Sequence, residues 1–440
     1  MLTYKDTYLA PIYFILLLLW VIWWKNKYYK NSPVKKYIIP AFILKCICCF
    51  LLAFLFEYYY GYSDSANYFQ GAKEIWSATI RNPFYGLELV FKSFENCSYE
   101  AQQFSPRLGE SIYAASLKNM YKISGFIGMF CFGSYLPIAL IMTLLSFIGS
   151  WKIYIVFVKE FPAYYNKLAL TCLFTPSFLL WTTNIMKEPL CIFGLGICVS
   201  ALYNLMKGKF TFFIILEMFV GAYIMLSFKS YIFYLFCFAA FWSLYVSFAT
   251  TVKKQYQILI KLIMVFMLLV LSFLAIANSN FLVDIFSSNF VNDVTFIQNV
   301  QIDAGGSVYT LPNVDDSSLF GIFRTYFNSL NVALFRPFLW ETPNIIAVSN
   351  ALESFAILLI TLYLLIKLKF TGFFKRAFKN RILTFSIVFT LLIAPLAGLV
   401  SFNFGTLVRY KTPMVPFYYT FLMLLYYETK DKNKIAKVSK

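Results

Sequence analysis

Long runs of apolar residues recur along almost the whole chain, separated by polar turns. Each run is close to the about 20 apolar residues that an α-helix needs to cross the hydrocarbon core of a bilayer. Such runs are too many and too long for the buried helices of a soluble domain. The pattern therefore predicts an all-α, polytopic integral membrane protein with about eleven transmembrane helices. The apolar windows are 8–24, 38–60, 134–150, 168–186, 190–206, 210–227, 230–250, 262–277, 346–366, 382–400 and 412–427.

Two long polar stretches interrupt this pattern, at residues 61–122 and 278–345. Both contain helix-like aromatic segments, which predicts short amphipathic helices that lie against the membrane. No separate soluble domain is indicated, so residues 1–427 are expected to form a single transmembrane domain. Residues 428–440 are expected to form a basic cytoplasmic tail.

The distribution of positive charge predicts the orientation of the helices. If the N-terminus lies outside and the C-terminus inside, 24 of the 38 Lys and Arg residues fall in cytoplasmic loops and 13 fall on the outer side. Loops rich in Lys and Arg tend to stay in the cytoplasm. Both long loops then face outward. Because this asymmetry explains most of the net charge of +18, no nucleic-acid partner is expected.

Composition supports the membrane class and excludes several kinds of chemistry. Of the 440 residues, 60% are hydrophobic and 13% are charged, whereas a soluble domain carries about 25% charged residues. The absence of histidine excludes imidazole bases and His-containing metal sites. Eight of the nine cysteines lie in apolar stretches, so neither a disulfide framework nor a metal site is expected. The sequence has no nucleotide-binding loop, and no cofactor is expected.

The first candidate site on the outer face follows the second apolar window, in segment 62–68. Asp64 and Tyr68 are four residues apart and share one face of a helix. Asp64 is a candidate general base at the mouth of a membrane cavity, and Tyr68 is a candidate for positioning a sugar. In the alternative interpretation, Ser63 or Asp64 merely caps the following helix.

The second candidate site is segment 176–189, which places two charged residues between apolar runs. Pro176 is expected to disturb the span over 168–186. Pro189 suits the first turn of the next helix, so Lys187 and Glu188 are expected at the N-terminus of that helix. Backbone amides at a helix N-terminus favour an anion, which predicts a substrate-binding site. The alternative is that both charges cover a short turn at the membrane interface. Lys229, in the next outward turn, is a weaker candidate of the same kind.

The third candidate site is segment 335–341, at the end of the second long loop. The guanidinium of Arg336 suits a phosphate, and so does that of the preceding Arg324. Trp340 offers a ring for stacking against a sugar, and Glu341 is a second candidate for the base. The alternative is an aromatic belt at the membrane interface with one salt bridge.

The fourth candidate site holds Arg409 and Lys411, which place positive charge on the outer side of the membrane. Charge on that side needs a partner, and a lipid-linked phosphate or pyrophosphate is the expected one. Glu217 and Glu353 lie inside apolar windows. Each is a candidate either for contact with substrate or a proton, or for an ion pair with a cation. The cations predicted to converge around the phosphate are Lys187, Arg336, Arg409 and Lys411.

The candidate segments form an ordered series of motifs. An outward Asp…Tyr pair is followed by Pro-Ser-x-x-x-Trp-Thr-Thr-x-x-x-Lys-Glu, Arg-Pro-Phe-x-Trp-Glu and Asn-Phe-Gly-x-x-x-Arg-Tyr-x-x-Pro. This order resembles bacterial membrane proteins related to exopolysaccharide and O-antigen repeat-unit polymerases (Wzy-type and EpsG-like). The Asp…Tyr and Arg-Tyr-x-x-Pro elements also resemble lipid-linked-sugar (GT-C) glycosyltransferases. In those enzymes the catalytic carboxylate follows the first span, whereas Asp64 follows the second predicted span.

The resemblance implies a multi-pass protein of the bacterial cytoplasmic membrane. Its implied activity is that of a glycosyltransferase, a polymerase that joins polyprenyl-pyrophosphate-linked oligosaccharides at the outer face. Its implied partners are a polyprenyl-(pyro)phosphate-linked glycan, membrane lipid and other polysaccharide-assembly proteins. Two alternatives stay open: a transporter or flippase of a lipid-linked sugar, and a non-catalytic membrane partner in envelope polysaccharide assembly.

Overall fold

The computed structural model describes residues 1–61, 63–110, 114–251, 295–296, 298–300, 307–312, 318–342 and 345–438. Within these ranges the regular secondary structure is helical, apart from one isolated β-bridge between Val308 and Asn403. The all-α prediction is therefore confirmed for this part of the chain. In the described part of the chain, seven helices are long and apolar enough to cross a membrane, as expected of a multi-pass membrane protein.

Backbone contacts divide the chain into two compact units, a division that the hydropathy pattern does not indicate. Unit 1 comprises Met1–Lys152, Leu179–Ala201 and Thr211–Lys229. Unit 2 comprises Ile153–Phe178, Leu202–Phe210 and Ser230–Lys440. The chain therefore passes between the units five times, and neither unit is a continuous segment.

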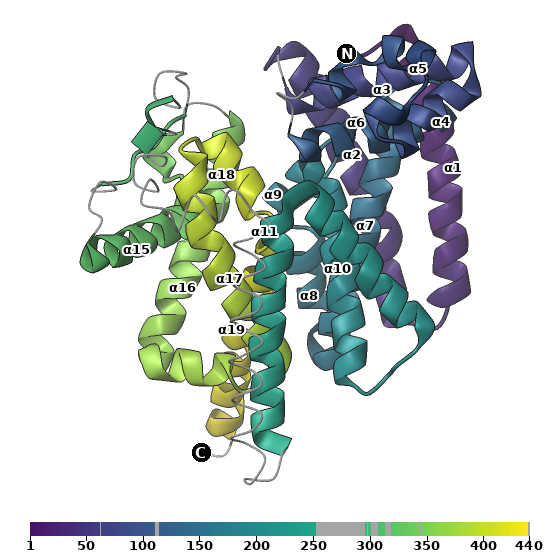
Figure 1. Cartoon of the computed structure of the whole chain (residues 1–440). Helices are drawn as coiled ribbons and strands as arrows, with labels where there is room; N and C mark the ends of the chain where they lie inside the picture. Colours follow the sequence, from purple (N-terminus) through teal and green to yellow (C-terminus); the bar gives the residue numbers. More distant parts are fainter. Residues whose placement is uncertain are drawn as a thin grey trace. The chain divides into compact units, whose positions relative to one another are not determined.

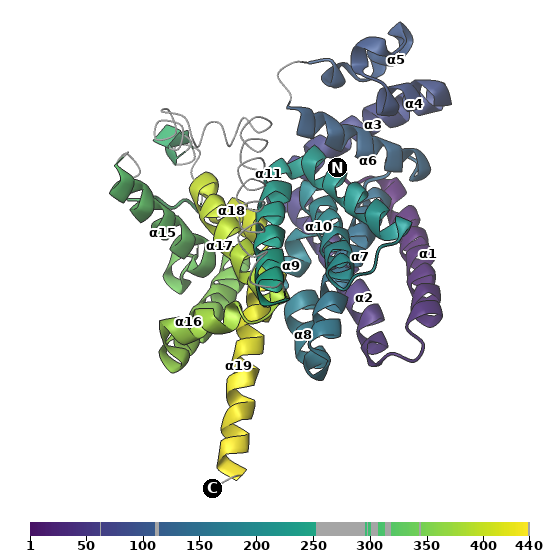
Figure 2. The same ribbon diagram turned by 60° about the horizontal axis from the view of Figure 1, so that its bottom comes forward.

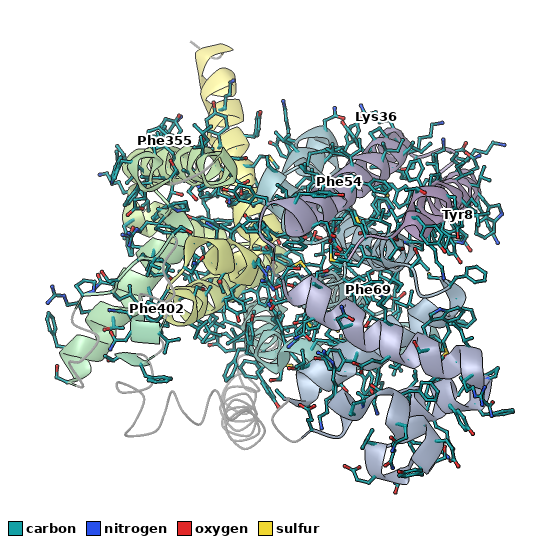
Figure 3. The ribbon with its side chains drawn as sticks, turned by 90° about the horizontal axis from the view of Figure 1, so that it is seen from above. Tyr8, Lys36, Phe54, Phe69, Phe355 and Phe402 are labelled. Carbon is teal, nitrogen blue, oxygen red and sulfur yellow. The ribbon has the colours of Figure 1, made fainter. Side chains whose placement is uncertain are left out.

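The candidate spans differ in how far their side chains are buried. In α1, 17% of the most apolar window is buried, against 72% in α10 and in α17. Tyr8, Leu16 and Trp20 of α1 are exposed, and Figure 3 shows Tyr8 at the rim of unit 1. An apolar helix with exposed side chains suits contact with lipid. The helices that contain the candidate spans are α1 (Tyr4–Tyr28), α2 (Ile38–Tyr58), α7 (Tyr135–Glu160), α10 (Lys187–Met206), α11 (Phe212–Thr251), α16 (Ile345–Ala377) and α17 (Arg381–Ser401) (Figure 1).

The apolar window 168–186 does not form one helix. It contains most of α8 (Tyr165–Leu173) and all of α9 (Pro176–Trp181), which are separate helices. Pro176 has no backbone N–H and disfavours helical conformation in the residue before it, which explains the break. The window predicted as one span with a disturbance at Pro176 therefore forms two short helices that are separated at that proline.

Two other predicted windows, 210–227 and 230–250, fall in the single element α11. Lys229 lies between them with φ −146° and ψ 77°, so the helical path is broken at that residue. The last window, 412–427, falls largely in α19 (Val415–Val438), whose helix continues into the predicted basic tail. The window 262–277 and 31 of the 68 residues of the predicted loop 278–345 lie outside the described residues.

The predicted outer loop 61–122 is largely helical and lies in unit 1. Figures 1 and 2 show its helices gathered at one end of that unit. A stripe along the first helix, including Phe69, Ala72 and Ile75, is buried where that helix packs against the last. A Cβ at Gly71 would lie 2.4 Å from the ring of Tyr121, so glycine permits this close packing. The helices are α3 (Asp64–Arg81), α4 (Pro83–Phe91), α5 (Tyr99–Phe104) and α6 (Ala115–Phe130).

Two glycines let α7 and α10 approach closely within unit 1. A Cβ at Gly149 would lie 2.3 Å from the carbonyl oxygen of Ile192, and a Cβ at Gly196 would lie 2.2 Å from the carbonyl oxygen of Gly149. Small residues at such crossings let helix backbones pack directly against each other, as is common between helices in membranes. The α7–α10 contact is therefore fixed by backbone packing.

Unit 2 is built around α17 and α19. α15 (Leu319–Phe335) packs against α17, and α19 packs against α8, α16 and α17. A polar network joins the helix ends: the carboxylate of Glu160 accepts hydrogen bonds from Asn380 at 2.8 Å and Tyr203 at 3.2 Å, and lies 3.1 Å from the ammonium of Lys207. Because Asn380 also caps α17, the network ties the end of α7 to the start of α17.

Candidate functional site

The first cluster of polar residues lies in unit 1, where α3 begins. The Ser63 side chain accepts a hydrogen bond from the backbone N–H of Ala66 and caps the helix. Asp64 follows in the first turn, where it is exposed. The capping role proposed for this segment therefore belongs to Ser63, and Asp64 is not among the buried residues of α3.

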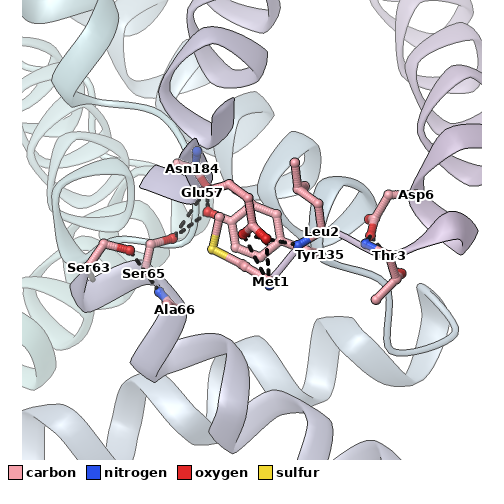
Figure 4. A network of polar contacts seen from close by, with 10 residues as sticks. All are labelled: Met1, Leu2, Thr3, Asp6, Glu57, Ser63, Ser65, Ala66, Tyr135 and Asn184. Carbon is pink, nitrogen blue, oxygen red and sulfur yellow. Dashed lines mark hydrogen bonds and ion pairs between the residues drawn. The ribbon is translucent and has the colours of Figure 1, made fainter. Parts of the chain in front are cut away.

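The next residue, Ser65, anchors the start of α3 in the interior of unit 1. Its hydroxyl lies 2.7 Å from the Tyr135 hydroxyl and donates to the Asn184 side-chain oxygen at 3.3 Å. The Tyr135 hydroxyl also donates to that oxygen. Figure 4 shows these three side chains meeting between elements that are far apart in the sequence. All three are fully buried, so the network fixes the start of α3 against the turn that precedes α10.

Asn184 is the centre of this network. Its φ of +75° lies in the left-handed region, which asparagine tolerates better than most residues. Its side-chain amide donates to the carbonyl oxygen of Cys49 at 3.3 Å, and its backbone N–H donates to the Thr143 hydroxyl at 3.2 Å. The turn that leads into Lys187 is therefore held on several sides.

Lys187 and Glu188 begin α10, as the sequence predicts. The Lys187 ammonium donates to the Ser116 hydroxyl at 2.9 Å. Glu188 forms a buried ion pair with Lys229, with 2.9 Å between the charged atoms, and the two side chains are 2% and 8% exposed. Lys187 also interacts electrostatically with Lys229, Glu188 and Asp64.

The structure thus brings together four predicted site residues of unit 1: Asp64, Lys187, Glu188 and Lys229. It does not place Tyr68 beside Asp64 as an exposed ring: the Tyr68 side chain is 5% exposed and packs inside the unit. Its burial follows from the apolar stripe of α3, on which Tyr68 lies and Asp64 does not. We name this group of four charged residues, Asp64, Lys187, Glu188 and Lys229, the α3–α10 cluster.

The second cluster lies in unit 2, around Arg336 at the end of α15. Its guanidinium makes a bidentate ion pair with Glu341, with 3.0 Å between Nε and Oε2. The same carboxylate accepts the backbone N–H of Phe338 at 2.8 Å. The guanidinium carbon also lies 5.4 Å and 5.2 Å from the ring centroids of Tyr309 and Phe404. Arg336 is therefore held by a carboxylate and two aromatic rings.

Lys411 lies against the backbone of Arg336. Its ammonium donates to the Arg336 carbonyl oxygen at 3.3 Å and to the Ser354 hydroxyl at 3.4 Å, and the residue is 2% exposed. Burial lowers the pKa of Lys411 to about 8, and the charge of Glu353 opposes this shift. Arg409 is two residues away on α18 (Phe404–Lys411) and is half-buried. We name Arg336, Glu341, Arg409 and Lys411 the α15–α18 cluster.

The remaining predicted residues lie in unit 2 on exposed surfaces. Trp340 is 79% exposed and stacks on Phe338, with 4.9 Å between the ring centroids. Arg324 is exposed on α15. The predicted convergence of four cations stays a prediction, because Lys187 belongs to unit 1 and Arg336, Arg409 and Lys411 belong to unit 2.

The two carboxylates that lie inside apolar windows of the sequence, Glu217 and Glu353, both have partners. Glu217 pairs with Lys152, with 2.6 Å between the charged atoms. Glu353 accepts hydrogen bonds from the Ser177 backbone N–H at 3.0 Å, the Ser177 hydroxyl at 2.6 Å and the Tyr419 hydroxyl at 2.8 Å. Among the described residues, no group of three or more Cys, Asp or Glu side chains is arranged to hold a metal ion.

Sequence reasoning did not single out Ser65, Tyr135 or Asn184. Asn184 had a usable signal, because it lies in a polar Thr-Thr-Asn run between two apolar stretches. Ser65 and Tyr135 had none, because serine at a helix start and tyrosine in an apolar window are common. Their role depends on contacts across 119 and 49 positions of sequence.

Comparison of the chain with protein-family models, with curated proteins and with solved structures finds no match.

Proposed function

We propose that the chain is a membrane glycosyltransferase that joins polyprenyl-pyrophosphate-linked oligosaccharides at the outer face of a bacterial cytoplasmic membrane. In this proposal the chain has eleven spans, the N-terminus is outside and the C-terminus is inside. The multi-pass helical architecture supports it. Other polysaccharide-assembly proteins are its proposed partners.

The observation that carries the proposal is the α3–α10 cluster. It combines an exposed carboxylate, Asp64, with the cation Lys187 and a buried ion pair, Glu188–Lys229. Burial of two charges at a break between apolar helices costs free energy. Charges kept in such a position therefore indicate a functional site. The Ser65–Tyr135–Asn184 network fixes the start of α3, which carries Asp64, relative to the turn before Lys187 and Glu188. A reacting group needs such a fixed position.

The proposed reaction transfers the donor glycan to a hydroxyl group of the acceptor sugar. The hydroxyl oxygen forms a bond to the anomeric carbon of the donor, and the bond between that carbon and the pyrophosphate oxygen breaks. The electron pair leaves with the polyprenyl pyrophosphate. The proton of the hydroxyl passes to the Asp64 carboxylate, which acts as the general base.

The geometry favours Asp64 over Glu341 as the base. Both Glu341 oxygens are engaged by Arg336, and one of them also accepts the Phe338 N–H. Protonation of Glu341 would break these charge-assisted hydrogen bonds, whereas Asp64 is exposed in the first turn of its helix. In unit 2, the cations of the α15–α18 cluster and the exposed Trp340 suit a phosphate and a sugar ring.

Replacement of Asp64 tests the proposal. Asp64→Asn keeps the size of the side chain and removes its basicity, so chain extension should slow by about 10²–10⁴-fold while the protein stays folded. The matched control is Glu100→Gln, an exposed carboxylate of the same predicted loop, which should retain the wild-type rate. The assay follows polymer length from a purified lipid-linked repeat unit in vesicles. Wild-type rates for Asp64→Asn would remove Asp64 from the mechanism.

The proposed topology is tested by cysteine labelling. Thr310 and Lys375 are exposed in the structure and fall on opposite sides of the membrane in the proposed orientation. Thr310→Cys should react with an impermeant maleimide in intact cells, and Lys375→Cys should react only after permeabilisation. The opposite pattern would place the α3–α10 cluster in the cytoplasm and rule out the proposed reaction.

A transporter or flippase of a lipid-linked sugar is the second candidate. The observation that favours it is the pair of broken helices, at Pro176 and at Lys229, because broken helices often surround transport sites. A transporter needs no general base. Full activity of both Asp64→Asn and Glu341→Gln in polymer formation would therefore favour this alternative.

A further inference from the structure

A cavity of about 510 Å³ lies within unit 2, between α8, α16 and α19. Its walls are mostly apolar and aromatic. Among the described residues that line it, Glu353 is the one charged side chain, and the Tyr419 hydroxyl donates to its carboxylate at 2.8 Å and marks the polar end of the cavity. The lining residues include Leu170, Phe174, Ile357, Leu422, Met423 and Tyr426.

The cavity is elongated along its helices. On α19 its lining runs from Tyr419 to Tyr427, and on α16 from Glu353 to Ile360. At about 1.5 Å of rise per residue, these stretches correspond to a length of about 10–12 Å. Ala356 and Ile360 are exposed although they line the cavity, so it opens to the side of the helices as well as along them.

The dimensions suit a hydrocarbon chain with side branches. A group of the size of water occupies about 30 Å³, so the cavity holds about 17 such groups. Its volume divided by its length gives a cross-section of about 40–50 Å². Apolar groups pack with heavy atoms about 4.0–4.5 Å apart, so a straight chain needs only about 20 Å². Unfilled space forfeits dispersion contacts, which favours a methyl-branched chain over a straight one.

The polar end of the cavity adjoins the α15–α18 cluster. Ser354 follows Glu353 in the sequence and accepts a hydrogen bond from Lys411, whose ammonium also binds the carbonyl oxygen of Arg336. The negative charge of Glu353 is balanced by three hydrogen-bond donors and by its interaction with Lys411. A lipid whose chain occupies the cavity would therefore place its head group at the end where the cations lie.

We infer that this cavity binds the polyprenyl chain of the lipid-linked donor, with the phosphate toward Arg336, Arg409 and Lys411. The inference rests on the proposed function for the identity of the lipid. It adds a binding site for the part of the substrate that takes no part in the chemistry. Interactions with such remote parts contribute to specificity and orientation.

The test uses the purified full chain in detergent and measures bound lipid by native mass spectrometry. The probes are geranylgeranyl phosphate and a straight-chain alkyl phosphate with the same number of carbons. We expect the branched probe to bind at least about tenfold more tightly, which corresponds to about 1.4 kcal/mol. Equal binding of both probes, or displacement of the branched probe by equimolar phosphatidylglycerol, would overturn the assignment to a polyprenyl chain.

Variants locate the binding site. Ala356→Trp fills the cavity from α16 and should weaken binding of the branched probe by at least about tenfold. Ile360→Trp is a second filling variant, and Leu359→Trp is the matched control, because Leu359 is 51% exposed on α16 and does not line the cavity. Retention of wild-type affinity in both filling variants, with Leu359→Trp also unchanged, would refute the site.

The polymer-extension assay separates this inference from the proposed function. If Ala356→Trp loses probe binding while Asp64→Asn extends polymer normally, the cavity stands and the proposed mechanism fails. If Asp64→Asn loses extension while the filling variants bind the probe and extend polymer normally, the mechanism stands and the cavity assignment fails.

Discussion

Removal of the Glu188 charge is the most direct perturbation of the α3–α10 cluster. Glu188 is 2% exposed in its side chain and lies 2.9 Å from the Lys229 ammonium. Glu188→Gln keeps the shape of the side chain and removes its charge. The change leaves Lys187 and Lys229, which already interact electrostatically, near each other without the carboxylate that offsets their repulsion.

The magnitude follows from the burial of the pair. Removal of one partner of a buried ion pair costs about 3–5 kcal/mol, because the other charge stays desolvated and unbalanced. At about 2 °C per kcal/mol, the value for large domains, the midpoint of thermal unfolding should fall by about 6–10 °C. Lys229→Met should cost less, because Lys187 remains available to Glu188.

The control is the variant in which both charges are replaced, Glu188→Met with Lys229→Met. Replacement of a whole buried pair by apolar side chains is often neutral or stabilising. The double variant should therefore recover most of the stability that Glu188→Gln loses, while chain extension stays impaired. Thermal unfolding in detergent, followed by size-exclusion chromatography after heating, measures all three variants against the wild type.

Two results would refute this reasoning. A Glu188→Gln midpoint within about 1 °C of the wild type would mean that the carboxylate is not buried beside Lys229. A double variant less stable than both single variants would mean that the side chains have separate structural roles.

Three further predictions concern other parts of the chain. Gly196→Leu should abolish folding, because its Cβ would lie 2.2 Å from the Gly149 carbonyl oxygen. Gly372→Ala should give wild-type yield, because its Cβ would make only an ordinary contact of 3.7 Å with the Cβ of Leu368. Lys411 has a pKa of about 8 in the folded state, below its ordinary 10.5. Burial of its charge therefore lowers the free energy of unfolding by about 3 kcal/mol below pH 8, and this loss of stability disappears as the pH rises toward 10.5. Thermal stability should therefore rise over this range in the wild type, and this component of the rise should be absent in Lys411→Met. Asn184→Gly keeps the left-handed backbone and removes the side-chain hydrogen bonds, so it should slow chain extension. It should lose less stability than Asn184→Ala, because alanine disfavours a positive φ. Equal losses of stability in the two variants would show that the backbone conformation is unimportant.

The sequence alone predicted the class of the protein and most of its helices. Apolar runs of about 20 residues identify helices that can cross a membrane, because the bilayer core sets that length. Candidate spans such as α1, α2 and α17 follow these windows closely. The start of α10 at Lys187 was also predicted, because the effect of Pro189 on backbone conformation is local.

Other features required the tertiary structure. Hydropathy reports how apolar a segment is but not whether its helix is continuous. Pro176 predicts a disturbance within window 168–186, but only the structure shows that the window forms two separate helices. The pairing of Glu188 with Lys229 joins residues 41 positions apart, and no sequence pattern distinguishes it from pairing with another charge. The burial of Tyr68 beside the exposed Asp64 depends on which face of α3 packs against α6.

The candidate site also depends partly on local sequence and partly on tertiary packing. Residue types at the ends of apolar runs identified Asp64, Lys187, Arg336 and Lys411, because a charge there needs a partner. Only the folded chain shows that Ser65, Tyr135 and Asn184 connect the start of α3 to the turn before α10. Local chemistry determines which residues are able to act, but their mutual distances depend on the packing of helices that are distant in sequence.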